Sequence, residues 1–248
     1  MEREILVILG ISVAGPILGS FLGVVRKPSE KLMYTALAFA GGVMLSISFL
    51  ELIPESIELS STTGCAIGIL IGVMIMFLLD KLIPHVHPEF GIPEQGNKLK
   101  KTAIYLIFGI FLHNIPEGMA IALGEVPEVG VNVYVIALAI AIHNIPEGIC
   151  TSAPYYHTSK KRLKSFLISS STAIPIVIGF IVASILYKFI SESMIGVIAG
   201  ATAGLMIYIT SDEIIPTSCS QNDHKPIFSL IFGILFVILL KSVILGYM

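Results

Sequence analysis

The amino-acid sequence predicts an all-α polytopic membrane protein with eight transmembrane helices. Its 248 residues are 55% apolar and only 13% charged, whereas an ordinary soluble domain is about 25% charged. The polar residues of such a chain could not cover a water-soluble globule, which excludes a soluble enzyme, a nucleic-acid-binding protein and a disordered protein. The apolar residues also form eight stretches, each near the roughly 20 residues that cross a hydrocarbon core about 30 Å thick.

Charged and turn residues separate the eight stretches along the chain. In order, the predicted spans are 4–25, 33–57, 63–84, 102–124, 131–153, 165–187, 193–216 and 226–246. The first follows Met-Glu-Arg-Glu, which is acidic as well as basic, and it is long enough to cross a bilayer. We therefore expect a retained helix and not a cleaved signal peptide. Together the spans make residues 1–248 a single transmembrane domain.

Basic residues mark the ends of these spans and predict their orientation. The loops after the first, third, fifth and seventh spans hold most of the 15 Lys and Arg residues. In order they carry Arg26, Lys27 and Lys31, then Lys81, Lys98, Lys100 and Lys101, then Lys160, Lys161, Arg162 and Lys164, then Lys225. Because cytoplasmic loops are enriched in Lys and Arg, these loops are predicted to be cytoplasmic and both termini to lie outside.

An internal repeat relates the second and seventh spans. Gly42–Pro54 and Gly204–Pro216 match at Gly, Met, Ile, Glu, Ile and Pro at a constant offset. One three-span unit would enter the membrane from outside and the other from the cytoplasm. Spans 1–3 and 6–8 are therefore predicted to form an inverted repeat around spans 4 and 5, a plan that recurs in secondary transporters.

A second and stronger repeat lies inside the fourth and fifth spans. His113–Gly118 and His143–Gly148 both read His-Asn-Ile-Pro-Glu-Gly. The His and Glu of each copy are four residues apart and share one helix face, with the Asn about 100° away. Two such helices facing each other would bring together imidazoles, carboxylates and amide oxygens, a ligand set typical of first-row transition metals. The predicted ligands are His113, Asn114, Glu117, His143, Asn144 and Glu147.

The two intramembrane glutamates argue for a functional site. An acidic side chain at a helix centre costs roughly 2.5–3.5 kcal/mol on insertion scales. Hydrogen bonds between membrane helices average only about 0.6 kcal/mol, so simple helix association would not offset Glu117 and Glu147. Pro116 and Pro146 also leave the carbonyls of Leu112 and Ile142 without intrahelical donors, which membranes tolerate only beside a polar cavity. These features favour a pathway through the protein.

The duplicated motif resembles the ZIP (Zrt- and Irt-like) family of metal-ion transporters. Further matches are the fragment at 136–149, Asp-Glu-Ile-Ile-Pro at 212–216 and a His-bearing loop between spans 3 and 4, and the bacterial zinc-transporting branch is the most similar. The resemblance covers essentially the whole chain and implies divalent-metal uptake, with one helix bundle moving. It implies a primary site of His113, Glu117, His143 and Glu147, and a second position of Asn114, Asn144 and the same glutamates.

One departure from the family affects the second position. The family often has a Glu directly before a Pro in span 6, but here Ile174 precedes Pro175. The second position therefore lacks that carboxylate, and it is either a weak metal position or a polar stop on the pathway. Met44 resembles a contact to the primary site, although a Met at helical spacing is also ordinary core filling.

Other polar residues near the span ends have two interpretations. Glu51 is predicted to face outside and Asp212 and Glu213 the cytoplasm, either as entrance and exit groups or as solvated helix ends. His85 and His87 form His-x-His in the long cytoplasmic loop, either as a metal-capturing pair or as part of an ordinary loop.

These observations predict a transporter, and not an enzyme, that takes up Zn²⁺ across the cytoplasmic membrane. Fe²⁺, Mn²⁺, Co²⁺ and Cd²⁺ are further candidate substrates because the predicted ligands are imidazoles and oxygens without thiolate. An intramembrane metalloenzyme that uses the same residues is the alternative. The expected partners are metal ions and lipid, with no cofactor and no nucleic acid, and both a monomer and a homodimer fit the sequence.

Overall fold

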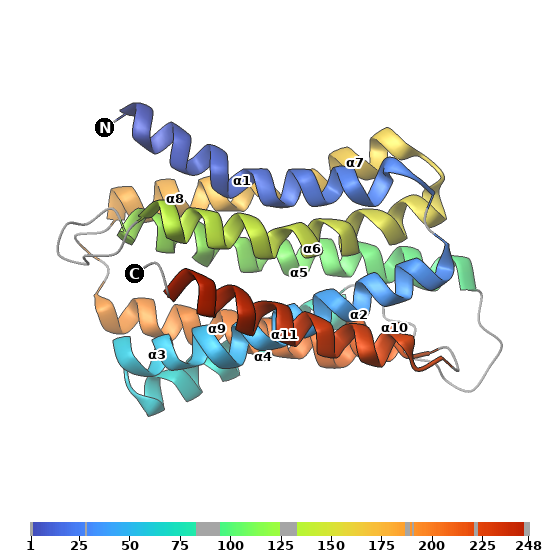
Figure 1. Cartoon of the computed structure of the whole chain (residues 1–248). Coiled ribbons are helices and arrows are strands. Elements are labelled where there is room, and N and C mark those ends of the chain that lie inside the picture. Colours follow the sequence, from blue (N-terminus) through green and yellow to red (C-terminus); the bar gives the residue numbers. More distant parts are fainter. Residues whose placement is uncertain are drawn as a thin grey trace.

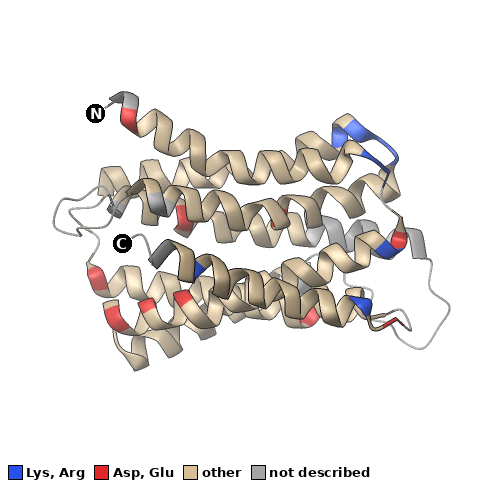
Figure 2. Ribbon diagram, viewed as in Figure 1, with Lys and Arg blue, Asp and Glu red and all other residues tan. Residues whose placement is uncertain are grey.

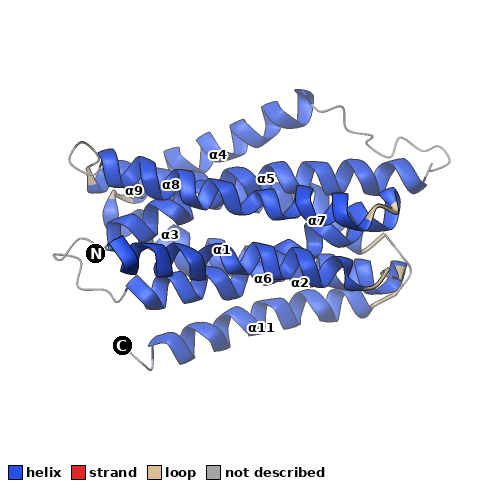
Figure 3. Cartoon of the chain, turned by 90° about the horizontal axis from the view of Figure 1, so that it is seen from above, coloured by secondary structure: helices blue, strands red, loops and turns tan. Residues whose placement is uncertain are grey.

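The computed structural model describes residues 2–27, 29–82, 95–124, 133–186, 189, 191–220 and 223–245, and within these ranges the regular structure is helical (Figure 3). Five helices run without a break: α1 (Glu2–Val25), α4 (Thr62–Leu82), α5 (Gln95–Gly124), α6 (Val133–Ser159) and α11 (Lys225–Leu245).

Three further rods are composite and contain a short segment of different helical pitch. The first joins α2 (Glu30–Ile47) to α3 (Ile53–Leu59) through the π-helical turn η1 (Ser48–Leu52). The second joins α7 (Arg162–Ser170) to α8 (Ile174–Leu186) through the 3₁₀ turn η3 (Ser171–Ala173). The third joins α9 (Glu192–Ile209) to α10 (Ile215–Ser218) through the π-helical turn η4 (Thr210–Ile214). The sequence does not predict these changes of pitch.

In the described part of the chain, 6 helical rods are long enough and apolar enough to cross a membrane. They cover Glu4–Val25, Glu30–Leu59, Thr62–Leu79, Arg162–Leu186, Glu192–Ser218 and Lys225–Val243. In α5 a shorter apolar stretch, Leu106–Ala122, surrounds the first His-Asn-Ile-Pro-Glu-Gly copy, and α6 carries the second. Basic residues gather at one end of the molecule and acidic residues are more numerous at the other (Figure 2). The basic end is the one predicted to be cytoplasmic.

The helices form two bundles that appear as two layers in Figure 1. We call α1, α5, α6 and α7–α8 the motif bundle, where α1 packs on α6 and α5 packs on α8. We call α2–α3, α4, α9–α10 and α11 the companion bundle, where α4 packs on α9 and α2 packs on α11. The two bundles meet where α2 contacts α6 and α5 contacts α9. Both copies of the motif therefore lie on helices that border the companion bundle.

The helix pairing follows the predicted inverted repeat. When the first three rods are exchanged with the last three and α5 with α6, the packing of α1 on α6 corresponds to that of α8 on α5, and the packing of α4 on α9 to that of α11 on α2. The glycines of the repeat show the same relation. A methyl group added to Gly42 would lie 2.0 Å from the carbonyl oxygen of Leu230 on α11, and one added to Gly204 would lie 2.2 Å from that of Ile69 on α4. Only glycine allows the two backbones to approach this closely at either position.

The two π-helical turns also occupy equivalent places in the repeat, and each is followed by a proline. Pro54 and Pro216 have no N–H to donate, and their rings crowd the carbonyl four residues earlier. The preceding residue in each case bonds five residues back, Ile53 to the carbonyl of Ser48 and Ile215 to that of Thr210. The carbonyl of Leu50, four residues before Pro54, instead accepts a hydrogen bond from Lys241 Nζ at 2.6 Å. Glu51 lies in η1 and Glu213 in η4, so the two glutamates occupy equivalent turns of the repeat.

Candidate metal site

The two His-Asn-Ile-Pro-Glu-Gly copies lie side by side because α5 packs against α6. All six predicted ligands are buried: His113, Asn114, Glu117, His143, Asn144 and Glu147. The most exposed are Glu117 at 9% and His143 at 8%. A carboxylate with so little access to water needs strong polar partners in the protein, or a bound cation, to remain charged.

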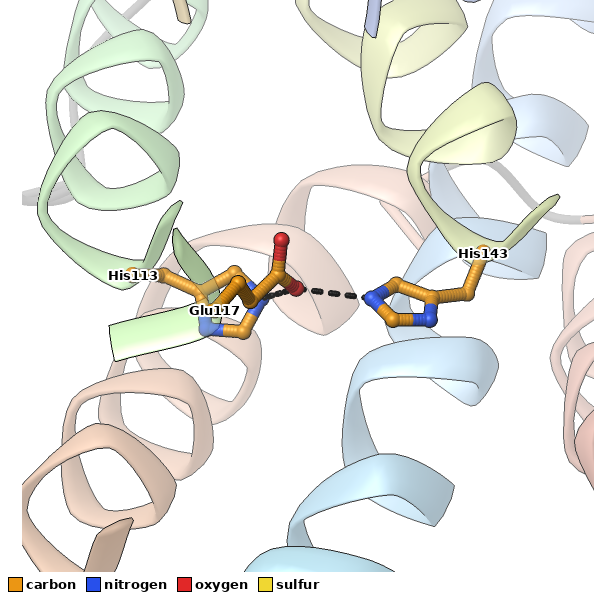
Figure 4. Close-up of side chains that lie close together, drawn as sticks. All are labelled: His113, Glu117 and His143. Atoms are coloured by element: carbon orange, nitrogen blue, oxygen red, sulfur yellow. Dashed lines mark hydrogen bonds and ion pairs between the residues drawn. The ribbon is translucent and has the colours of Figure 1, made fainter. Parts of the chain in front are cut away.

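Glu117 lies at the centre of this group and faces both histidines (Figure 4). Its Oε1 is 2.7 Å from His143 Nε2, within hydrogen-bond geometry. The same oxygen is 2.8 Å from His113 Nε2, within ion-pair distance but outside hydrogen-bond geometry. One ligand atom from each of these three side chains lies within 4.8 Å of the others, which is close enough to hold one metal ion. The imidazole and carboxylate donors are those that zinc commonly takes.

The two asparagines are held in different ways. Asn144 Nδ2 donates to Glu117 Oε2 at 2.7 Å, so both oxygens of Glu117 have a partner. Asn114 Nδ2 donates instead to the carbonyl oxygen of Thr172 at 2.6 Å. That carbonyl belongs to the 3₁₀ turn η3, where the helical hydrogen-bond pattern changes before Pro175. The break in the α7–α8 rod thus supplies an acceptor that fixes the amide of Asn114.

Several ligand atoms of the group have no hydrogen-bond partner within the described part of the chain. They are His113 Nδ1 and Nε2, Asn114 Oδ1, Asn144 Oδ1, and Glu147 Oε1 and Oε2. Glu147 Oε1 is 3.7 Å from His113 Nε2. Buried polar atoms are nearly always hydrogen-bonded, and leaving one unsatisfied costs about 1–3 kcal/mol. All these atoms except a protonated ring nitrogen can donate an electron pair, so the group fits a divalent cation.

Close backbone contacts hold the two motif turns in place. A methyl group added to Gly118 would lie 1.9 Å from the carbonyl oxygen of Ile176 on α8. One added to Gly148 would lie 2.6 Å from the carbonyl oxygen of Pro16 on α1. The glycine that ends each motif copy therefore lets a neighbouring helix pack against the turn that carries the glutamate.

Sequence reasoning missed a network of buried hydroxyl groups one turn beyond Glu147. Thr151 Oγ1 donates to the carbonyl oxygen of Glu147 at 3.1 Å, and it shares a 2.5 Å hydrogen bond with Ser169 Oγ. Ser169 Oγ also bonds Ser20 Oγ at 2.7 Å. The three residues are fully buried and join α6, α7 and α1. The run of hydroxyl residues at 169–172 was the available signal, because hydroxyls deep in a membrane bundle need partners.

The remaining predicted residues lie outside this group. Met44 is fully buried in an apolar cluster that lies between the two bundles, where Thr210 Oγ1 approaches its sulfur at 3.8 Å. Glu51, Asp212 and Glu213 are partly buried in η1 and η4. His85 and His87 fall outside the described residues. Ile174, where the family often has Glu, is 53% exposed on α8.

Comparisons with known proteins relate nearly the whole chain to one family. Residues 4–103 and 91–241 match the sequence profile of the family described as ZIP Zinc transporter. A protein named zinc transporter ZupT from Salmonella arizonae is 33% identical over 249 aligned residues, which cover 94% of this chain and 95% of that protein. Proteins of the same name from Salmonella paratyphi A and Salmonella newport are 34% identical over the same share of both chains.

Proposed function

This chain belongs to the ZIP zinc transporter family, and we propose that zinc enters the cytoplasm through the site formed by α5 and α6. The family membership makes the protein a multi-pass membrane transporter for the uptake of divalent metal, with zinc as its substrate, and not an enzyme. The observation that supports the site is the buried group of His113, Glu117 and His143, whose ligand atoms lie within 4.8 Å of one another.

We propose that Glu117 is the central ligand and that His113, His143 and Glu147 complete the primary position. Glu117 already contacts both histidines, while both carboxylate oxygens of Glu147 have no hydrogen-bond partner in the described chain. A zinc ion in this group would neutralise two carboxylates whose burial is otherwise costly. Metal binding needs deprotonated ligands, so uptake should fall when the pH is lowered through the range in which histidine titrates.

Asn114 Oδ1 and Asn144 Oδ1 form the proposed second position together with the two glutamates. Each amide is oriented by its own N–H bond, Asn114 to Thr172 and Asn144 to Glu117, which directs the amide nitrogen away from a metal-binding role. Because residue 174 is isoleucine, this position has one carboxylate fewer than the family often supplies. We expect it to bind metal more weakly than the primary position.

We propose that the route to the site passes the π-helical turns. Glu51 would attract cations on the outer side, and Asp212 and Glu213 would serve the same purpose on the cytoplasmic side. Met44 would contact the primary position only if the bundles shift, because its sulfur is now occupied by Thr210. Both termini lie outside in this scheme, residues 1–248 form a single domain of eight spans, and the membrane is the cytoplasmic membrane.

The function can be tested by metal influx into proteoliposomes that contain a fluorescent chelator. Wild-type protein should admit Zn²⁺ with saturation, and Fe²⁺, Mn²⁺, Co²⁺ and Cd²⁺ can be compared with Ca²⁺ as the excluded ion. Glu117→Gln should abolish zinc influx. Glu192→Gln, which alters an exposed carboxylate at the start of α9, is the matched control and should leave influx unchanged.

Two outcomes would contradict the proposal. Folded wild-type protein that binds zinc without passing it would favour the alternative of a metalloenzyme with the same ligands. Influx that survives Glu117→Gln would remove the α5–α6 site from the transport route.

The oligomeric state can be measured on the same preparation. The molar mass of the protein in detergent, determined by light scattering, will show whether the working unit is a monomer or a homodimer.

A further inference from the structure

A histidine and a glutamate face each other at the basic end of the molecule (Figure 2), away from the α5–α6 site. His157, on the last turn of α6, places Nε2 at 3.9 Å from Oε1 of Glu30, on the first turn of α2. The His157 side chain is 21% exposed and that of Glu30 is 62% exposed. The pair is therefore open to water, and it joins the motif bundle to the companion bundle.

His157 lies on nearly the same face of α6 as the central site. Cys150 and His157 follow His143 by seven and fourteen residues, which is close to two and four turns at 3.6 residues per turn. At 1.5 Å per residue, His157 is about 21 Å further along the helix than His143. Cys150 is fully buried in the same apolar cluster as Tyr34 and Leu37 of α2. This face of α6 thus follows the boundary with α2 from the central site to the pair.

A second carboxylate near the pair already has cationic partners. The other described carboxylate of the nearby loops, Asp223, is 3.5 Å from Lys31 Nζ. The backbone N–H of Lys225 also donates to Asp223 at 3.1 Å, and this bond, with the two lysines, holds the pKa of Asp223 below its usual value. Asp223 is therefore committed to cationic partners of its own.

An imidazole and a carboxylate are the same ligand types that form the central site. With only two protein ligands and water in the remaining positions, such a pair binds zinc weakly compared with a site of three or four ligands. Weak binding suits the last step of uptake, because an ion that is held tightly at the membrane surface does not leave. We propose that His157 and Glu30 form a zinc-release site at the cytoplasmic end of the boundary between α2 and α6, and this proposal rests on the proposed function and orientation.

The proposal is tested with zinc on the full-length protein in detergent and in proteoliposomes. His157→Ala and Glu30→Gln should each remove one weakly bound zinc ion in equilibrium dialysis, while the tightly bound zinc remains. Both variants should also lower the maximal influx rate several-fold with little change in KM, because loading of the central site is unaltered. His224→Ala is the matched control, since His224 is an exposed histidine at the start of α11.

The binding and transport measurements separate this proposal from the proposed function. Loss of the weak zinc ion in the two variants supports the release site even if the wild type moves no zinc, a result that would overturn the proposed function alone. Unchanged zinc stoichiometry in both variants overturns the release site. Unchanged stoichiometry with faster influx would show instead that the pair is a latch between the bundles. Thermal melting of both variants should match the wild type, because both side chains are partly exposed.

Discussion

The two His-Asn-Ile-Pro-Glu-Gly copies have identical sequences but unequal surroundings. In the first copy, Glu117 receives close contacts from His113, His143 and Asn144. In the second, Glu147 has neither carboxylate oxygen hydrogen-bonded to the described chain, and its nearest histidine nitrogen is 3.7 Å away. An identical motif therefore supplies one carboxylate that is already organised and one that remains available to a cation.

The asymmetry arises outside the motif, where the neighbouring helices differ. Asn114 of the first copy bonds the carbonyl of Thr172 in the α7–α8 rod, and Asn144 of the second bonds Glu117. Gly118 packs on α8 and Gly148 on α1, so each copy borders a different end of the inverted repeat. Duplication therefore gives both copies the same polar side chains, while the surrounding helices give these side chains different partners.

The largest expected effect separates the two glutamates. Glu117→Gln should lower zinc influx by at least about 100-fold, because it removes the carboxylate that both histidines face, whereas Glu147→Gln should cost about tenfold. Initial influx rates and zinc-binding isotherms will measure the difference. Equal losses in both variants would show that the two glutamates become equivalent once zinc is bound.

Substitution of the histidines should have the next largest effect, and the two should be alike. His113→Ala and His143→Ala each remove one imidazole nitrogen that lies next to Glu117, at 2.8 and 2.7 Å respectively. We therefore expect the zinc affinity to fall by a factor of about 10 to 100 in both variants. Zinc isotherms on the purified variants provide the measurement. A loss confined to one histidine would place the ion nearer that helix than the structure suggests.

The asparagines should separate binding from stability. Asn144→Ala removes a donor to Glu117 and should weaken zinc binding several-fold. Asn114→Ala leaves the Thr172 carbonyl without its donor, and an unsatisfied buried group costs about 1–3 kcal/mol, so it should lower the free energy of unfolding more than Asn144→Ala does. The KM for zinc and the melting temperature in detergent will show this. The reverse order of effects would mean that Asn114 is the stronger ligand.

The smallest expected effect on zinc binding concerns the two motif glycines, whose added methyl groups would meet helix backbone and not the metal ligands. Gly118→Ala and Gly148→Ala both force a methyl group against a carbonyl oxygen, and overpacking typically costs about 1–3 kcal/mol. Gly118→Ala should destabilise more, because its methyl group would lie 1.9 Å from that oxygen as against 2.6 Å. Gly10→Ala, which meets nothing within 4 Å, is the control and should keep or raise the melting temperature. Equal melting temperatures for the two motif variants would show that both turns can shift.

Much of the fold could be predicted from the sequence. Apolar stretches of membrane length, the Gly42–Pro54 and Gly204–Pro216 repeat and the doubled motif indicate a helical membrane protein with an inverted repeat, and the helix pairing agrees. The π-helical turns could not be predicted, although Pro54 and Pro216 are consistent with them, because a proline can be accommodated by a kink, a break or a change of register. Hydropathy does not choose among these.

The sequence by itself determined that the His and Glu of each motif copy share one helix face, because they are four residues apart. It could not determine which glutamate is central, because two identical hexapeptides carry identical local information. The tertiary structure decided that through contacts between the two helices, in which His143 and Asn144 of α6 both bond the carboxylate of Glu117 on α5. The pairing of His157 with Glu30 has the same origin, since it depends on how the two bundles meet.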